Sequence, residues 1–164
     1  MIRKLSFALA FIGIGVAMAH GADKVVASTL GLTALPHATT ELRSTVVAND
    51  LRGHFKTDGK VDGTNVSFMV DTGSTVVALN ETSAAALGLK PTPADYNASV
   101  GTANGSVKAA RARLATVDVG GVIVRDVDAI VLPDEALKEN LLGLSFLSRL
   151  KRLEFAGGKL VLEQ

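Results

Sequence analysis

The sequence predicts an all-β domain, a sandwich or a barrel, because short runs of β-branched and apolar residues alternate with glycine-containing turns. The chain has 164 residues, which is enough for one domain with a hydrophobic core, and no internal repeat is visible. It is 48% hydrophobic but only 4% aromatic, so valine, leucine and alanine have to form that core. Cysteine is absent, which excludes disulfides and thiolate metal sites.

The expected strands all lie beyond residue 43. The pairs Asp58-Gly59 and Asp62-Gly63 are typical of turns between strands, and Gly120-Gly121 and Gly157-Gly158 predict two further turns. The segment 101–105, with two glycines and an asparagine, predicts the tip of a hairpin. The expected strands are 44–48, 53–56, 60–61, 66–70, 97–100, 107–119, 122–125, 127–132, 152–155 and 159–162.

Helical segments are expected to be few and short. Asn80 is a good cap for a helix over 80–88, and Gly88 suits its end. Residues 134–139 predict one helical turn, and 145–150 predict a second short helix.

The N-terminus has the layout of a secretory signal. Arg3 and Lys4 precede an apolar run over 5–19 that ends in Ala17-Met18-Ala19, a small-x-small cleavage pattern. The run is shorter than the roughly 20 residues that span a bilayer. We therefore expect a cleaved signal peptide (1–19), a linker or arm (20–42) and a folded domain (43–164). The protein would be exported, periplasmic or secreted, with retention on the inner membrane through an uncleaved apolar segment as the alternative.

The charge pattern argues against nucleic-acid binding. The formal net charge is only +1 at pH 7, and the lysines and arginines are scattered along the chain. The histidines show no metal-ligand spacing, and a calcium loop starting at Asp58 would need a glutamate where Met69 stands.

Asp71-Thr72-Gly73-Ser74 is the most informative segment of the chain. It lies between two β-rich runs, 66–70 and 75–79. An unpaired carboxylate is costly to bury, so an acid in such a place is normally kept for chemistry. The alternative is a plain turn, in which aspartate and glycine are both common. No serine-nucleophile motif of the Gly-x-Ser-x-Gly type competes with this interpretation.

An ordered set of segments, rather than this tripeptide alone, resembles the retropepsin-like aspartic proteases. The resemblance is greatest to the bacterial, secreted or membrane-anchored Asp-Thr-Gly enzymes related to retroviral proteases. Residues 68–74 are similar to the catalytic loop, 100–106 to the flap, 140–147 to the apolar-apolar-Gly loop with its helix, and 160–164 to the terminal strand. The resemblance implies a closed, barrel-like β domain with one or two short helices that forms a two-fold homodimer.

The resemblance also implies roles for the site residues. Asp71 of each protomer would share one proton with its counterpart and activate a water, without metal or organic cofactor. Thr72 would hydrogen-bond across the dimer, and Gly73 would let the backbone approach the carboxylate. Ser74 would donate to the outer oxygen of Asp71. The flap residues Thr102, Ala103, Asn104 and Gly105 would close over an extended peptide or protein segment.

Two alternatives stay open at this point. Retroviral enzymes usually carry an arginine that braces the dimer after the second glycine, whereas Leu144 follows Gly143 here. The chain could therefore be a monomer in which Asp71 never meets its counterpart. It could also be a non-catalytic dimeric module that binds peptides or a partner, although Asp71, Thr72 and Gly73 are all present.

Overall fold

The computed structural model describes residues 42–102 and 105–164. The expected signal (1–19), nearly all of the expected arm, and Ala103 and Asn104 of the expected flap lie outside these residues. The described part of the chain contains ten strands and only two short α-helices. The predicted all-β fold class is therefore confirmed.

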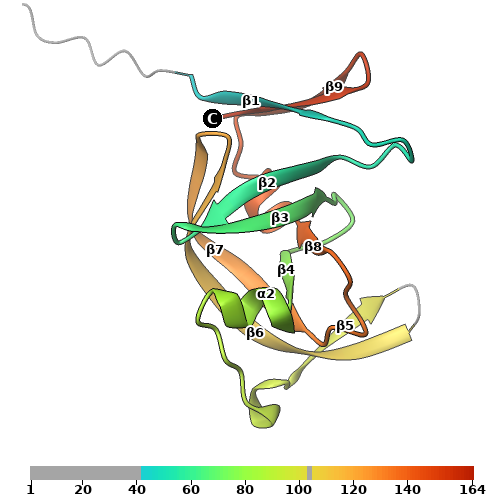
Figure 1. Ribbon diagram of the computed structural model, residues 1–164, viewed down its shortest axis with the longest axis vertical. Helices are drawn as coiled ribbons and strands as arrows, with labels where there is room; N and C mark the ends of the chain where they lie inside the picture. Colours follow the sequence, from blue (N-terminus) through green and yellow to red (C-terminus); the bar gives the residue numbers. More distant parts are fainter. Residues whose placement is uncertain (1–41, 103–104) are drawn as a thin grey trace, which may run out of the picture. The chain divides into compact units, whose positions relative to one another are not determined.

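Six strands form a closed barrel (Figure 1). Lys60 and Val61 of β2 pair with Asp118 and Val117 of β6, which joins the two ends of the sheet. Closure shortens the free strand edge that the described barrel offers to other chains. In spatial order the strands are β2 (Lys56–Val61), β3 (Thr64–Val70), β8 (Asn140–Leu142), β4 (Val77–Asn80), β7 (Val122–Leu132) and β6 (Gly105–Val119).

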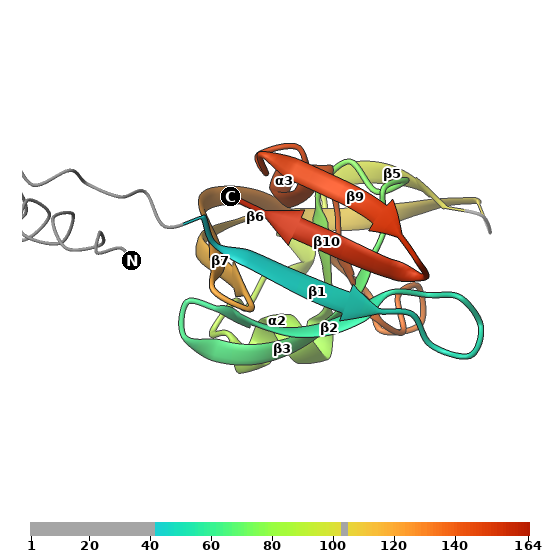
Figure 2. The ribbon, with the colours of Figure 1, turned by 90° about the horizontal axis from the view of Figure 1, so that it is seen from above.

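Four further strands are attached to this barrel. Among the strands that the structure describes, β5 (Ala98–Thr102) pairs only with β6 and forms a hairpin with it. A separate sheet has the order β1 (Ser44–Ala48), β10 (Lys159–Glu163), β9 (Arg152–Ala156), and Figure 2 shows these three strands side by side.

The core is built mainly from aliphatic side chains, as the composition predicts. Val47, Leu160 and Leu162 of the separate sheet are buried in the same cluster as the barrel side chains. Of the phenylalanines in the described residues, Phe68 and Phe146 are fully buried with them. Along β10, buried residues alternate with exposed or half-buried ones, so one face of this strand packs against the core.

The helices are short and capped as the sequence indicates. α2 (Glu81–Ala86) begins after Asn80, whose Oδ1 accepts a hydrogen bond from the Ser83 amide at 2.8 Å. α3 (Leu144–Leu147) is shorter than the helix expected over 145–150, and η1 (Pro93–Asp95) is a single 3₁₀ turn. The helical turn expected over 134–139 is not formed; residues 134–136 make a hydrogen-bonded turn instead. Among the described helices, none is long and apolar enough to cross a membrane.

Three expectations about local structure were wrong. Asp58-Gly59 is not a turn, because both residues lie within β2. A Cβ on Gly59 would lie 2.7 Å from the Asp118 carbonyl oxygen, so this glycine permits the close approach of β6 that closes the barrel. β7 runs unbroken through Asp126, where two strands were expected, and residues 140–142 form β8, which was not expected as a strand.

Candidate active site

The loop that carries Asp71 is clamped by a strand from elsewhere in the chain. β8 lies between β3 and β4, parallel to the first and antiparallel to the second. The Asp71 amide donates to Leu142 O at 3.1 Å, and the Leu144 amide donates to Ser74 O at 2.8 Å. A third bond joins the Ser145 amide to Thr75 O at 3.0 Å. The loop is therefore bound to residues about 70 positions away along its whole length.

Asp71 is half-buried, and its carboxylate accepts a hydrogen bond from the Gly73 amide at 2.8 Å. A Cβ on Gly73 would lie 3.1 Å from Asp71 Oδ1. Glycine at this position lets the backbone amide approach the carboxylate without crowding it. The part in catalysis that the resemblance implies for Gly73 stays a prediction.

Gly143 has less room for a side chain than Gly73, the glycine of the Asp71 loop. A Cβ added there would lie 2.1 Å from Val76 O and 2.7 Å from Ser74 O, both of which are backbone atoms of the Asp71 loop. No side chain fits that space unless the loop moves. The apolar-apolar-Gly pattern at 141–143 therefore has a physical cause, since β8 can pass under the loop only with glycine here.

Ser145 is a structural residue that the sequence analysis did not identify. Its hydroxyl donates to Asp128 O at 2.7 Å and accepts from the Val77 amide at 2.9 Å. These bonds connect α3 to β7 and to the start of β4, directly behind the Asp71 loop. Nothing in the local sequence distinguishes this serine from an ordinary helix residue.

Ser74 does not make the bond expected of it, and the bond expected of Thr72 would be made to a second copy of the chain. Ser74 does not donate to Asp71; its hydroxyl donates to Val76 O at 2.7 Å, which tightens the loop itself. Thr72 is exposed at the tip of the turn. Its predicted bond across a dimer stays a prediction.

Asp71 and the β5–β6 hairpin line one cleft of about 730 Å³. Gly73, Ser74 and Thr102 border the same cleft, whereas Thr72 and Gly105 do not. Thr102 Oγ1 donates to Gly105 O at 2.8 Å across the end of the hairpin. The floor is apolar, made by Ala78, Val100, Ile130, Leu132, Leu137 and Leu141. The structure thus brings the predicted catalytic loop and the described part of the predicted flap to the two sides of one cavity.

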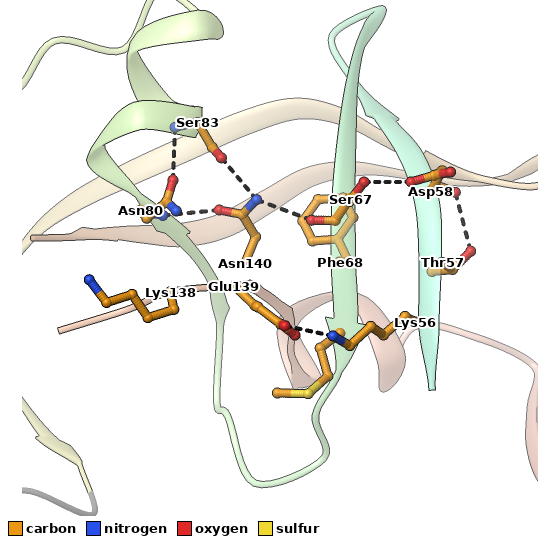
Figure 3. Close-up of a pocket in the computed structure, with 11 residues that line it drawn as sticks. Lys56, Thr57, Asp58, Ser67, Phe68, Asn80, Ser83, Lys138, Glu139 and Asn140 are labelled. Carbon is orange, nitrogen blue, oxygen red and sulfur yellow. Dashed lines mark hydrogen bonds and ion pairs between the residues drawn. The ribbon is translucent and has the colours of Figure 1, made fainter. Parts of the chain in front are cut away.

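A second hollow of about 450 Å³ lies beside β8 and does not include Asp71 (Figure 3). The buried side-chain amide of Asn140 accepts a hydrogen bond from the backbone amide of Asn80 at 3.0 Å. It donates to Ser67 O at 3.1 Å and to Ser83 Oγ at 2.9 Å. Lys56 pairs with Glu139 at its rim. These groups satisfy one another, so the hollow is a structural junction that holds β8 between β3 and β4.

Tyr96 lies before the hairpin, in the segment that leads to β5. Its hydroxyl donates to Glu81 of α2, and its ring packs against the main core cluster, outside the cleft lining. Burial and the hydrogen bond to the Glu81 carboxylate raise its pKa to about 12. In the described residues, no group of three or more His, Asp or Glu side chains could hold a metal ion.

Comparison with known proteins agrees with this geometry. The family described as "gag-polyprotein putative aspartyl protease" matches residues 57–149, which include the Asp71 loop, the hairpin and β8. The crystal structure of a retropepsin-like aspartic protease from Rickettsia conorii is 34% identical, with a TM-score of 0.67, and covers 75% of this chain and 92% of that one.

Two curated relatives carry the same region. An uncharacterized protein from the cobV 5′ region of Sinorhizobium sp. is 38% identical over 109 residues, which is 66% of this chain and 47% of the relative. An uncharacterized protein of Rickettsia prowazekii (strain Madrid E) is 34% identical over 112 residues, which is 68% of this chain and 48% of the relative. The chain thus spans about half the length of the curated relatives it matches. With a family match over most of the described domain and a barrel in which β8 clamps an Asp-Thr-Gly loop, the chain belongs to the gag-polyprotein aspartyl protease family and has its retropepsin-like fold.

Proposed function

We propose that this protein is an aspartic endopeptidase that works as a homodimer, with one Asp71 from each protomer in a shared site. One observation carries the proposal: among the described residues that line the 730 Å³ cleft, Asp71 is the only carboxylate. Hydrolysis of a peptide bond by this type of chemistry needs two carboxylates that share one proton. The second one therefore has to come from another copy of the chain, across a two-fold axis.

The chemistry follows from the coupling of the two carboxylates. Because two acids about 3 Å apart cannot both ionise, the pair holds a single proton at its working pH. The ionised member takes a proton from a water as the water oxygen attacks the scissile carbonyl carbon. The protonated member donates its proton to the carbonyl oxygen. Collapse of the tetrahedral diol then breaks the C–N bond. The carboxyl that took the water proton gives it to the leaving nitrogen, and the other carboxylate takes a proton from a diol hydroxyl, which restores the shared proton.

Exposed groups beside the loop support an interface at this face. Thr72 is exposed at the tip of the turn, and the apolar Leu144, which replaces the bracing arginine, is 38% exposed directly after Gly143. Exposed apolar side chains next to an incomplete site are suited to cover by a second copy. Thr72 would donate across this interface and hold the two loops together.

The first test is cleavage of a peptide library by the full chain and by its Asp71→Asn variant, from pH 4 to 7. We expect cleavage by the wild type and a rate lower by about a thousandfold or more in the variant, because the shared proton and the base are both lost. Asp118→Asn serves as the control, since Asp118 is outside the cleft. If the folded, dimeric wild-type protein cleaves no peptide of the library, the endopeptidase proposal is overturned and a binding module is favoured.

The second test addresses the dimer. Adding an excess of Asp71→Asn protein to a fixed amount of wild type should suppress activity, because mixed dimers carry only one functional carboxylate. Adding Asp118→Asn protein in the same way should not suppress activity. Activity that is unchanged by excess Asp71→Asn protein would show that each chain acts alone, and sedimentation analysis would report whether dimers form at all.

We also propose that the protein is exported, with residues 1–19 as the signal and a membrane tether if that segment is not removed. The basic start, the apolar run and the small-x-small pattern support this. Expression in a bacterium, fractionation and N-terminal sequencing of the product test it. A mature N-terminus near residue 20 in the periplasm or medium is expected, and an intact chain in the cytosol would contradict export.

A further inference from the structure

Four side chains from neighbouring strands form a row across the floor of the cleft. Leu141 of β8 is opposite Ala78 of β4, Ala78 is opposite Ile130 of β7, and Ile130 is opposite Arg111 of β6. Residues opposite one another on adjacent strands place their side chains on the same face of a sheet. All four line the 730 Å³ cleft that contains Asp71. The row is thus apolar near the catalytic loop and ends in a guanidinium group.

Arg111 has no carboxylate partner in the described part of the chain. It is exposed and appears in no ion pair, whereas Arg113, two residues further along β6, pairs with Asp126 and Asp128. Asp95 shares a smaller hollow with Arg111. The Asp95 carboxylate is used locally, because it accepts hydrogen bonds from the Thr92 amide at 2.6 Å and the Thr92 hydroxyl at 2.7 Å.

Asp71 and Arg111 are the only charged groups among the described residues of the cleft lining. A lone arginine on an otherwise apolar floor offers five donors in a planar fork that matches a carboxylate. The bound peptide would partly shield this pair from water, and an ion pair is stronger when it is shielded. The cleft therefore has the composition of an apolar binding surface with one position set aside for an anion.

The strand spacing indicates where that anion would lie along a bound peptide. Three strand spacings separate β8 from β6, which is about 14 Å at the usual spacing of about 4.8 Å. An extended peptide advances about 3.3 Å per residue, so 14 Å is about four residues, and the reach of the arginine side chain shortens this by one or two.

We propose that Arg111 selects peptide substrates with an aspartate or glutamate about two or three residues from the scissile bond. The inference rests on the proposed endopeptidase function and names its substrate class: segments with apolar side chains around the cleaved bond and an acidic side chain beyond them. In a symmetric dimer each half of the site carries its own Arg111, so the acid qualifies on either side of the bond.

The test compares matched peptides that differ only in Glu or Gln at one position, scanned over the four residues on each side of a cleaved bond. Wild-type protein should cleave the best Glu peptide with a kcat/KM about tenfold above its Gln counterpart. In Arg111→Gln the ratio should fall to about one. In Arg111→Glu it should invert, and a Lys peptide should become the preferred substrate.

Lys108→Gln is the control for net charge, because Lys108 is exposed on the same strand but does not line the cleft. It should keep the wild-type ratio, and thermal unfolding should show that all variants are folded. Equal cleavage of Glu and Gln peptides by the wild type, or an acid preference that survives in Arg111→Gln, would overturn the role of Arg111 and leave the endopeptidase standing.

If no peptide is cleaved, the proposed endopeptidase function is wrong. The role of Arg111 is then tested separately by measuring peptide binding. Fluorescence anisotropy with the same labelled peptides should still show tighter binding of the Glu peptide, by about tenfold, and its loss in Arg111→Gln. Equal binding of the Glu and Gln peptides to wild-type protein would overturn the inference.

Discussion

The Asp71 loop and the β5–β6 hairpin border the same cleft but are held in different ways. The loop is bound by backbone hydrogen bonds to residues 142–145, and Ser145 ties the segment behind it to β7. The hairpin has no such support among the described residues, where β5 pairs with β6 alone and its other edge has no partner strand. The difference fits the two tasks of the proposed endopeptidase, in which the Asp71 carboxylate would be held in place and the opposite wall would admit an extended peptide.

The largest effect is expected from a substitution that forces the Asp71 loop away from residues 142–145. Gly143→Ala places a methyl group against two backbone carbonyls of the Asp71 loop, so we expect a loss of about 3 kcal/mol in the free energy of unfolding and of nearly all activity. Urea denaturation and peptide cleavage would measure both.

The matched control is a glycine of the hairpin. An added Cβ at Gly101 meets no atom within 4 Å, so Gly101→Ala should change the free energy of unfolding by less than about 0.5 kcal/mol. Equal stability of the two variants would mean that the clamp is not rigid.

A smaller effect is expected from the hydroxyl behind the loop. Ser145→Ala removes the donor to Asp128 O and the acceptor for the Val77 amide, which should cost about 2 kcal/mol of unfolding free energy. Ser148→Ala is the comparison, because its exposed hydroxyl bonds only to Leu144 O within the same helix and should contribute less than about 0.5 kcal/mol. Similar thermal melts for both variants would rule out Ser145 as a support of the loop.

The hairpin should show the opposite balance between stability and activity. Val100 lines the cleft and is half-buried, so Val100→Ala should lower kcat/KM about tenfold while costing about 1 kcal/mol or less in stability. Val46→Ala on β1, where the side chain is 56% exposed outside the cleft, should leave kcat/KM unchanged. A hairpin variant that loses stability and activity together would weaken the contrast between the two regions.

The smallest effect concerns the base of the hairpin and appears only at alkaline pH. Tyr96 is the only tyrosine, so the ultraviolet absorbance of its phenolate can be followed directly, with an expected pKa of about 12. Because this folded-state pKa lies above the unfolded value of about 10, the contribution of Tyr96 is fully present below pH 10. It is lost as pH rises toward 12. In Tyr96→Phe that part of the alkaline loss of stability should be absent. Ionisation near pH 10 in the folded wild type would contradict a contribution of burial and of the Glu81 hydrogen bond to stability.

Much of the fold follows from local patterns in the chain. Alternating apolar residues predict most strands, Asn80 marks the start of α2, and Asp62-Gly63 forms its turn with positive φ at both residues. The isolated acid at Asp71 and the order of segments around it led to the family that the comparisons show. These features depend on neighbouring residues, so one sequence is enough to recognise them.

The features that make the site were decided by contacts between distant segments. Ser145 is 68 residues from Val77, and Asn140 is 60 residues from Asn80, so no local pattern could indicate their hydrogen bonds. Gly59 reads locally as a turn residue, yet it lies in a strand because the β6 backbone approaches it.

In the sequence, nothing distinguishes Arg111 from other polar residues of a strand. The register of four strands places it on the floor of the cleft that also contains Asp71. The chain's own pattern therefore indicates most of the strands and the acid that we propose to be catalytic. The tertiary structure decides which backbone and side-chain groups surround that acid, because close approach and strand register arise only when segments far apart in the chain pack together.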